Sequence, residues 1–367
     1  MNDSTPTQIH QKSITPISTG EAKSSIDMYI GQLLDSRINA ARQVSPHYEA
    51  LWQAINDLYF AGGKRMRPYM TLLAYSAFGG ERSSDILPTA AAQELLHQAM
   101  LIHDDIIDRD IIRYGTKNVT GQFDEAYEGF FSKAGEQRHF AESAAILAGD
   151  LLLSEAHVQI SQTVAPSYVI ADLQRMLGEA VFHVVGGELL DTEASFRTPN
   201  DIDPLTIAAQ KTATYSFVGP LSMGATLAGA PREQVDLLND LGNTVGIAFQ
   251  LRDDIIGIFG DEAITGKSNE GDIREGKQTL LIQEFYKLAD QKQKTVFEKI
   301  FGQSSSTTQD VERARQLLIE TGTVTAVETL ITNYESVAQE QISQLDIPNE
   351  FRVVFIDLVN KCVQRDK

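Results

Sequence analysis

Two clusters of aspartates lie in apolar stretches of this sequence, far apart along the chain. The first is DDIID at residues 104–108, and the second is Asp253-Asp254, which Asp261 follows. An ionised carboxylate is costly to bury unless a cation or a hydrogen-bond donor faces it. Two such clusters facing each other would hold hard cations, and Mg²⁺ ions held in this way bind diphosphate groups.

The first cluster has the spacing of one helix face. Asp104 and Asp108 are four residues apart, so on a helix they share a face and repel each other unless a cation lies between them. The residues before them, Leu96, Ala99 and Met100, are apolar. We therefore expect a carboxylate rim above an apolar wall, which suits a ligand with a charged head and a hydrocarbon tail. The alternative is a solvated acidic end of a helix.

The second cluster is weaker evidence by itself. Asp253 and Asp254 end an apolar run, but the next position on the face of Asp253 is Gly257 rather than an acid. Asp261 returns to roughly the face of Asp254 if the helix continues through Gly257 and Gly260. The second cluster becomes informative when it is taken together with the first.

A basic turn complements the acidic clusters. Residues 62–68 read GGKRMRP, with two glycines that free the backbone and three cations within four positions. Arginine forks match phosphate oxygens and lysine adds a point charge, so this turn predicts a phosphate site that needs no metal. The alternative is a basic turn at the surface. Three further cations in neutral or acidic surroundings are Lys211, Lys267 and Lys277.

Together these features indicate two ligands rather than one. The acidic clusters imply a diphosphate bound through metal, and the basic turn implies a second phosphorylated substrate bound directly. The apolar wall implies a hydrocarbon tail. No Ser-His-Asp arrangement, reactive-cysteine context or cysteine-based metal site competes with this interpretation.

These motifs resemble those of the trans-isoprenyl diphosphate synthases, the family that includes farnesyl and geranylgeranyl diphosphate synthases. The resemblance runs from about residue 62 to residue 277 and rests on GGKRMRP, on DDIID and on FQLRDD at residues 249–254. It implies an all-α, single-domain bundle of long helices around a central cavity, of the isoprenoid synthase type, and a homodimer. It also implies an enzyme that condenses isopentenyl diphosphate with an allylic diphosphate and releases diphosphate.

The resemblance further implies roles for individual residues. The expected ligands of three Mg²⁺ ions are Asp104, Asp108 and Asp253. The residues expected to bind the allylic diphosphate are Arg113, Lys211, Gln250, Lys267 and Lys277. The residues expected to bind isopentenyl diphosphate are Lys64, Arg67 and His97. The expected supporting residues are Asp105, Asp254, Glu188 and Asp191. The expected catalytic residues are Lys211, Thr212 and Gln250, with the carbonyl of Lys211 and the hydroxyl of Thr212 beside the allylic cation.

The sequence departs from the family pattern at two positions. The family usually has two arginines before the glycine that follows the first motif, whereas this chain reads Arg113-Tyr114-Gly115. A phenol donates a hydrogen bond but carries no charge, so isopentenyl diphosphate is bound more weakly or by a substitute cation, such as Lys117 or Arg138. The second departure is Gly257 in place of the usual third acid of the second motif.

The resemblance assigns the control of product length to the channel wall before the first motif. The residue five positions before Asp104 often sets the channel floor in this family, and here it is Ala99 rather than a bulky aromatic. Met100 and Leu96 are the other expected wall residues. A C15 product is therefore not favoured. We expect C20, with C25 or longer as the alternative.

Two other classes of function share parts of this pattern. A class I terpene cyclase has an Asp-rich motif and Mg²⁺ in a helical bundle, but it binds one diphosphate and needs no basic turn. A non-catalytic partner subunit of a prenyl synthase would keep the fold without the chemistry. Tyr114 and Gly257 favour this second alternative, and the retained acidic and basic residues oppose it.

The composition limits the class of protein. The 367 residues are 42% hydrophobic and 22% charged, as in soluble globular chains, and a formal net charge of −19 opposes a nucleic-acid partner. The single cysteine, Cys362, excludes an internal disulfide. No apolar run is long enough for stable membrane insertion, and the N-terminus lacks the apolar core of a signal peptide. We therefore expect a cytoplasmic protein.

Hydrophobic periodicity is helical from about Ile26 almost to the end of the chain. We expect a mobile N-terminal tail at residues 1–24 and a single all-helical prenyl synthase domain at residues 25–367. Residues 116–139 are polar, aromatic and glycine-containing, which predicts a long loop or a short extra helix next to the first acidic cluster. Such a segment is either functional or a tolerated surface insertion.

Overall fold

The first helix begins where a capping box allows it. The computed structural model describes residues 15–133, 135–194, 196–197, 201, 203–260 and 269–364. In helix α1 (Thr19–Arg42), Ser18 and Glu21 cap each other's backbone, and Ile26, Ile30 and Leu34 are buried along one face. The predicted boundary of the tail at residue 24 is therefore wrong, because the capping box starts the helix at Thr19. Residues 1–14 lie outside the described residues.

Helices make up nearly all of the remaining described chain. They are α2 (Pro46–Ala61), α3 (Met66–Ala77), α4 (Ser83–Ile107), α5 (Val119–Ala126), α6 (Glu136–Ser161), α7 (Ser167–Ala194), α8 (Pro204–Ile207), η2 (Ala208–Val218), α9 (Gly219–Leu227), α10 (Arg232–Phe259), α12 (Gly271–Glu275), α13 (Leu280–Leu288), α14 (Gln291–Phe297), α15 (Thr308–Glu320), α16 (Thr323–Gln344) and α17 (Asn349–Val363). Two strands, β1 (Ile112–Arg113) and β2 (Thr116–Lys117), form an antiparallel hairpin. The prediction of an all-α fold is confirmed. Among the described residues, no helix has both the length and the apolar character needed to cross a bilayer.

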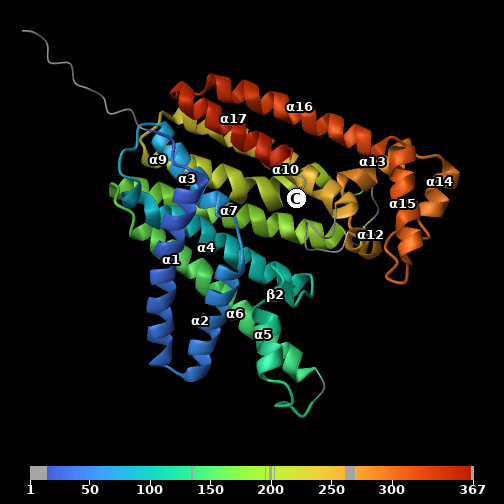
Figure 1. The fold of residues 1–367 in the computed structure, drawn as a ribbon, viewed down its shortest axis with the longest axis horizontal. Coiled ribbons are helices and arrows are strands. Elements are labelled where there is room, and N and C mark those ends of the chain that lie inside the picture. The colour runs from blue at the N-terminus through green and yellow to red at the C-terminus, as the bar shows by residue number, and fades with distance from the viewer. Residues whose placement is uncertain are drawn as a thin grey trace, which may run out of the picture.

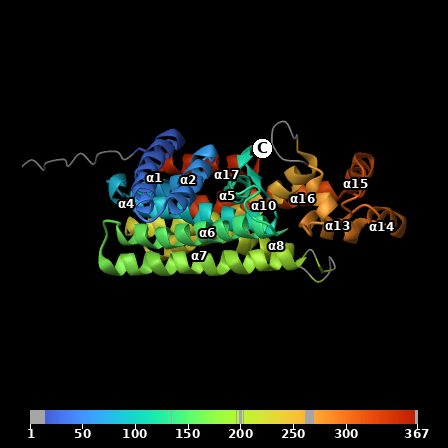
Figure 2. The same ribbon diagram turned by 90° about the horizontal axis from the view of Figure 1, so that it is seen from below.

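The long helices lie side by side in layers. Helix α10 runs through the middle of the molecule, with α16 and α17 along one side of it and α12 to α15 gathered near one end (Figure 1). Helices α6 and α7 form an outer layer that is seen edge-on in Figure 2. Helix α4 packs on α6, and η2 contacts both α7 and α10. This arrangement brings the C-terminal half of α4 and the C-terminal half of α10 close to η2.

The segment at residues 116–139 contains the short extra helix that its composition predicts as one of two possibilities. Helix α5 packs against α6 through aromatic side chains. The ring of Tyr127 lies 4.7 Å from that of Phe140 and 6.2 Å from that of Phe123, measured between centroids. These contacts give α5 a small core of its own next to the end of α4.

Candidate active site

A cavity of about 1270 Å³ opens where α4, α7, η2 and α10 meet. Its lining includes Asp104 of the first acidic cluster, Asp253 and Asp254 of the second, and Lys64 and Arg67 of the basic turn. Apolar side chains from four helices line another part, among them Met100, Ile146, Val184 and Phe249. Both acidic clusters, the basic turn and an apolar wall therefore share one cavity.

Arg113 fixes the first acidic cluster at the end of α4. Asp105 is buried, and its Oδ1 accepts a hydrogen bond of 2.7 Å from Nε of Arg113. Nη2 of Arg113 lies 3.1 Å from Oδ2 of Asp104. Burial raises the pKa of Asp105 even though Arg113 opposes this effect. Burial alone would lower the pKa of Arg113, but the two carboxylates raise it, so the guanidinium stays charged.

Lys211 links the first cluster to α7. Its Nζ lies 2.7 Å from Oδ2 of Asp191, 2.9 Å from Oε2 of Glu188 and 3.5 Å from Oδ1 of Asp104. Glu188 and Asp191 are three residues apart, so α7 presents both carboxylates on one face. Burial would lower the pKa of Lys211, but these three carboxylates raise it. The predicted supporting residues Glu188 and Asp191 thus lie next to a predicted binding residue.

Lys211 and Thr212 belong to η2, a stretch of π-helix. Such stretches are rare, and they are frequently found at functional sites. Glycines on both sides let η2 come close to its neighbours. A Cβ at Gly187 of α7 would lie 2.2 Å from the main-chain nitrogen of Lys211, and one at Gly246 of α10 would lie 2.4 Å from Cα of Ala213.

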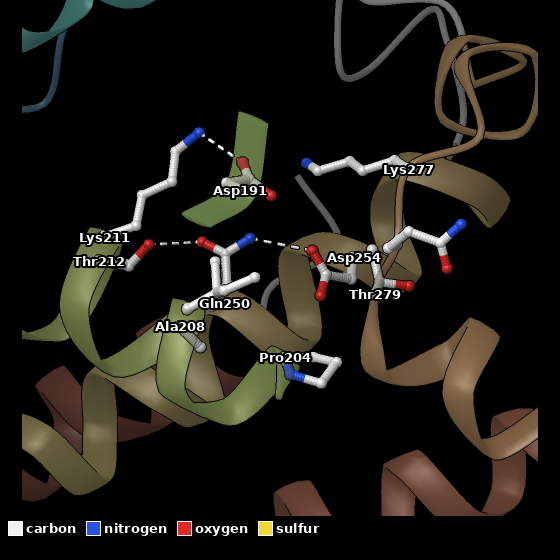
Figure 3. Close-up of a pocket in the computed structure, with 11 residues that line it drawn as sticks. Asp191, Pro204, Ala208, Lys211, Thr212, Gln250, Asp254, Lys277 and Thr279 are labelled. Carbon is white, nitrogen blue, oxygen red and sulfur yellow. Dashed lines mark hydrogen bonds and ion pairs between the residues drawn. The ribbon is translucent and has the colours of Figure 1, made fainter. Parts of the chain in front are cut away.

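A chain of hydrogen bonds connects η2 to the second acidic cluster (Figure 3). Oγ1 of Thr212 donates to Oε1 of Gln250 at 2.6 Å, and Nε2 of Gln250 donates to Oδ1 of Asp254 at 2.9 Å. Burial raises the pKa of Asp254 to about 6, against the attraction of Lys277. This chain fixes the amide of Gln250 between Thr212 and the acidic cluster.

Lys277 extends towards Asp254 and Asp191 from the segment before α13 (Figure 3). Burial would lower its pKa, but the carboxylates of Asp272, Asp254 and Asp191 raise it. The amine is therefore charged in the metal-free protein. The other predicted lysine of this group, Lys267, lies outside the described residues, as does Asp261.

Burial, and then the charge of neighbouring acids, raises the pKa of several carboxylates near this end of the cavity. Burial first, and then Asp104 and Glu188, raise the pKa of Asp108 to about 6. Within the described residues, no three His, Cys, Asp or Glu side chains converge on a common point that could hold a metal ion. Mg²⁺ commonly takes one or two carboxylates and fills its remaining positions with water and substrate phosphate oxygens. The carboxylates present therefore suit Mg²⁺ ions that take one or two protein ligands each and are also coordinated by the oxygens of one diphosphate.

Arg65 holds the basic turn in place and does not face the cavity. Its backbone is left-handed, with φ of 55°, and its side chain is buried. Its Nε lies 2.7 Å from Oδ1 of Asp27, and its Nη1 lies 3.2 Å from Oε1 of Glu94. It also donates to the carbonyl oxygens of Gly62 and Tyr59, each at 2.7 Å. Of the three cations in the turn, the other two line the cavity.

Arg67 and His97 meet at two residues of η2 that the motifs do not include. Nη2 of Arg67 donates to Oγ of Ser216 at 2.6 Å, and the guanidinium lies 4.7 Å from the ring centre of Tyr215. The hydroxyl of Tyr215 lies 3.4 Å from Nδ1 of His97. Burial and then the nearby arginines, Arg67 first, lower the pKa of His97 well below its usual value. His97 is therefore a neutral hydrogen-bonding group at this end of the cavity.

Tyr114 stands where the family has its second arginine, and it packs on the basic turn. Its ring lies so close to Gly62 that a Cβ there would come within 2.7 Å of it. Its side chain lines the cavity beside Lys64 and Arg67. Burial raises the pKa of Tyr114, so the phenol is neutral.

Neither of the two cations expected as substitutes, Lys117 and Arg138, lies at Tyr114. Lys117 pairs with Glu125 at 2.6 Å, and Arg138 pairs with Glu142 at 2.6 Å. Neither Lys117 nor Arg138 is among the residues that line the cavity. The two cations that we considered as replacements for the second arginine are thus held elsewhere by acids.

The three predicted wall residues differ in their position. Met100 lines the cavity. Ala99 and Leu96 are completely buried and are not among its lining residues. This follows from the packing of α4 on α6, which leaves one face of α4 for the cavity and covers another.

Comparison with known proteins decides the family. Residues 48–318 match the family model of polyprenyl synthetase. The chain belongs to this family. The membership confirms the predicted isoprenoid synthase fold and the predicted prenyltransferase activity. Polyprenyl synthetases are enzymes, so the class of function predicted from the motifs is established for this chain.

Several known proteins are similar to this chain over most of its length. A geranylgeranyl diphosphate synthase of Methanosarcina mazei is 30% identical over 319 residues, which are 87% of this chain and 90% of that protein. A geranylfarnesyl diphosphate synthase of Aeropyrum pernix is 31% identical over 320 residues, 85% of this chain and 92% of that protein. The solved geranylgeranyl pyrophosphate synthase of Corynebacterium glutamicum, complexed with isoprenyl diphosphate and magnesium, has a TM-score of 0.87 at 28% identity and covers 95% and 100% of the two chains. These findings support the predicted use of Mg²⁺.

Sequence reasoning missed three residues that line the cavity. Tyr215 and Ser216 contact Arg67, and Asp272 lies near the second motif. Arg65 was expected to bind phosphate, but it holds the turn from behind instead. The sequence could have indicated Asp272, because it lies between Lys267 and Lys277, which were both expected to bind the allylic diphosphate. No local pattern marks Tyr215 or Ser216, since their role depends on η2 facing the basic turn.

Proposed function

We propose that the protein lengthens an allylic diphosphate by condensing it with isopentenyl diphosphate, with C20 as the favoured product. The observation that carries this proposal is the one cavity lined by both acidic clusters, the basic turn and an apolar wall. One diphosphate binds through metal ions at the acidic end, the part of the cavity around Asp104, Asp253 and Asp254. The other diphosphate binds at the basic turn without metal. The apolar wall takes the hydrocarbon tail of the allylic substrate.

Asp104, Asp108 and Asp253 are the proposed ligands of three Mg²⁺ ions. When bound, these ions supply positive charge that stabilises the leaving diphosphate. Lys211 and Lys277 extend into the same space and add charge to its oxygens. The contacts of Lys211 with α7 support this role, since they hold the amine at the acidic end before substrate arrives.

The remaining residues of the acidic end have supporting roles in this proposal. Asp105 orients Arg113 at the edge of the first cluster, and Asp254 orients the amide of Gln250. Arg113 and Gln250 then contribute hydrogen bonds to the allylic diphosphate. Lys267, also proposed for this group, lies outside the described residues.

The reaction begins with cleavage of the bond between C1 and oxygen of the allylic substrate, and the electron pair leaves with the diphosphate. The hydroxyl of Thr212 and the carbonyl of Lys211 lie beside the developing allylic cation and stabilise its charge. The C3=C4 double bond of isopentenyl diphosphate attacks C1 through C4, and a proton then leaves C2. The departing diphosphate accepts this proton, so no side chain has to act as the base.

Isopentenyl diphosphate binds at the basic turn. Lys64 and Arg67 provide its positive charge, and the neutral His97 provides a hydrogen bond. Nε of Arg67 is buried and has no hydrogen-bond partner among the described residues. In the proposal it donates a hydrogen bond to a diphosphate oxygen. Tyr114 contributes a hydroxyl where the family usually has a second guanidinium, so this substrate binds through fewer charges.

A second copy of the chain completes the proposed enzyme. Helices α6 and α7 form an outer layer (Figure 2). Some of their exposed side chains are large and apolar. Leu147 is 57% exposed and Phe182 is 73% exposed, and neither lines the main cavity. Apolar patches of this kind are normally covered by a partner, and we propose a homodimer through this face. Light scattering of wild type and of Phe182→Glu tests this, with dimer expected for the first and monomer for the second.

Product analysis tests the reaction itself. The purified chain alone is incubated with Mg²⁺, isopentenyl diphosphate and farnesyl diphosphate, and products are identified by mass spectrometry. A C20 diphosphate that forms only with Mg²⁺ is expected. A cyclic hydrocarbon from the allylic substrate alone would point to a terpene cyclase. No product from the wild-type chain would point to a non-catalytic subunit.

A further inference from the structure

An arginine from α15 contacts the C-terminal end of α10. Helix α15 belongs to the group of helices gathered near that end (Figure 1). Nε of Arg315 donates a hydrogen bond to the carbonyl oxygen of Ile258 at 2.8 Å. Its Nη2 donates to the main-chain carbonyl oxygen of Asn269 at 3.0 Å and also to the side-chain oxygen of Asn269. One guanidinium therefore joins the last turn of α10 to the segment before α12.

Asn269 strengthens the same connection. Its Nδ2 donates a hydrogen bond of 2.8 Å to the carbonyl oxygen of Gly260, the residue that caps α10. The last four carbonyl groups of a helix have no partner within it, and they carry the negative end of the helix dipole. Arg315 and Asn269 satisfy two of these groups, and the charge of Arg315 lies at the end of the helix where a cation is favourable.

The packing of α15 fixes the position of Arg315. Val311, Ala314 and Leu318 of this helix are completely buried, and the side chain of Arg315 is only 13% exposed. Its Nη1 also lies 3.3 Å from Oε2 of Glu312, an exposed acid of the same helix. An exposed ion pair within one helix contributes little, whereas hydrogen bonds from a charged donor contribute more. The contacts with α10 and Asn269 therefore set the orientation of the guanidinium.

The segment that Arg315 joins to α10 continues into the acidic end. Asn269 lines the main cavity, as do Asp272 and Lys277, which follow it along the chain. The amide of Lys277 donates to the carbonyl oxygen of Asp272 at 3.0 Å, which ties these two residues into one turn. Asp253 lines the same cavity from α10. The separation between Asp253 and Lys277 therefore depends on how the segment before α12 is joined to α10.

We propose that Arg315 is a positioning residue for the allylic diphosphate. It is not among the described residues that line the cavity, and it acts through the segments that it joins. By holding the segment before α12 against α10, it sets the separation between Asp253, a proposed metal ligand, and Lys277, which faces the diphosphate oxygens. The inference rests on the proposed function, because it concerns the subsite of the allylic substrate. It extends this subsite to a helix that none of the motifs includes.

Two variants of Arg315 and one control test the inference. Arg315→Gln removes the charge and the forked donor. Arg315→Lys keeps the charge, but a single amine does not replace a planar fork that contacts two segments. Arg313→Gln is the matched control, because Arg313 lies on the same helix and its hydrogen bonds go to Gln316 and Glu320, which are also on α15. Thermal melts establish that each variant is folded.

The first measurement is steady-state kinetics with farnesyl diphosphate and isopentenyl diphosphate. Arg315→Gln should raise KM for the allylic substrate about fivefold and leave KM for isopentenyl diphosphate within about twofold of wild type. Arg315→Lys should raise KM for the allylic substrate about threefold, and Arg313→Gln should match wild type for both substrates. A merely structural role would lower the melting temperature and the fraction of active enzyme, and hence kcat, without changing either KM.

The second measurement is calorimetry of inorganic diphosphate and Mg²⁺ with the full chain, which needs no prenyl transfer. The Mg²⁺-dependent affinity for diphosphate should fall about fivefold in Arg315→Gln and stay at the wild-type value in Arg313→Gln. If wild type binds Mg²⁺ and diphosphate but forms no prenyl product, the proposed function fails, while the calorimetry still decides the role of Arg315. If wild type binds no diphosphate, the proposed function and the inference both fail.

Wild-type KM values and diphosphate affinity in folded Arg315→Gln would overturn the inference, as would equal rises in the two KM values. Full restoration of the wild-type values by Arg315→Lys would also overturn it, because a charge without the fork would then be enough. If Arg315→Gln does not fold, the comparison of Arg315→Lys with Arg313→Gln decides in the same way.

Discussion

Gly187 lies directly against the backbone of Lys211, so that a Cβ at residue 187 would come within 2.2 Å of the main-chain nitrogen. The next residue on α7, Glu188, pairs with the amine of the same lysine at 2.9 Å. One turn of α7 thus provides both the space for η2 and a carboxylate that orients its lysine. Any side chain at residue 187 has to push η2 away from the acidic end.

Gly187→Ala should therefore lower kcat strongly. We expect a loss of about 10- to 100-fold, because Lys211 and Thr212 move away from the substrate together, and a destabilisation of about 1–3 kcal/mol from overpacking. Gly186→Ala is the matched control, since a Cβ at Gly186 meets nothing within 4 Å. Steady-state rates and thermal melts of both variants check this. Equal rates for the two variants would contradict the role given to Gly187.

The sequence predicted much of this end of the cavity because its motifs follow helix geometry. Asp104 and Asp108, or Glu188 and Asp191, are spaced so that a helix must place them on one face. The π-helical form of η2 could not be predicted in this way. It depends on two glycines in other helices, and no local pattern in residues 208–218 specifies that contact.

Asp27 should control the affinity for isopentenyl diphosphate from outside the cavity. Its Oδ1 accepts hydrogen bonds from Nε of Arg65 at 2.7 Å and from the hydroxyl of Tyr59 at 2.9 Å, and Arg65 fixes the basic turn. Asp27→Asn should raise KM for isopentenyl diphosphate about fivefold and leave KM for the allylic substrate unchanged. Asp35→Asn, an exposed position on the same helix, is the control. An equal rise in both KM values would indicate a general loss of stability instead.

His97 should make the stability of the metal-free protein depend on pH. Its pKa is lowered in the folded protein, first by burial, so below about pH 6.5 the unfolded chain takes up a proton that the folded protein does not. Above that pH, His97 is neutral in both states and stability does not depend on its protonation. Below that pH, the free energy of unfolding decreases by at most about 1.4 kcal/mol for each pH unit.

Urea unfolding between about pH 5 and pH 7.5 measures this effect. His97→Asn should flatten the decrease in stability towards low pH, because asparagine keeps a polar group and does not titrate. His139→Asn, at an exposed histidine, should leave the decrease as in wild type. The same pH dependence in His97→Asn and wild type would show that His97 is not held neutral.

Met100 should limit product length more than Ala99 does. Met100 lines the cavity, whereas Ala99 is buried between helices. Met100→Phe should shift the product from C20 to C15, because the larger ring narrows the channel. Ala99→Phe should mainly lower stability, by about 1–3 kcal/mol. Mass spectrometry of products with thermal melts checks both. If Ala99→Phe shortens the product more, the wall is set by Ala99, as the sequence resemblance implied.

Several positions in the site could not be predicted because their partners come from distant segments. Arg65 reads as one of three phosphate-binding cations in GGKRMRP, but Asp27 and Glu94 turn it inward. Gly257 reads as a lost acid, but α12 brings Asp272 into the same space. Both cases depend on tertiary contacts between helices, which periodicity within one helix does not contain.

The central claim is that one cavity binds two diphosphates at separate ends, and the KM values of two lysine variants test it most directly. Lys64→Gln should raise KM for isopentenyl diphosphate about tenfold and leave KM for the allylic diphosphate within about twofold of wild type. Lys277→Gln should give the reverse, with KM for the allylic diphosphate raised about tenfold. If both variants raise KM for the same substrate, the two ends do not hold separate diphosphates and the account is wrong.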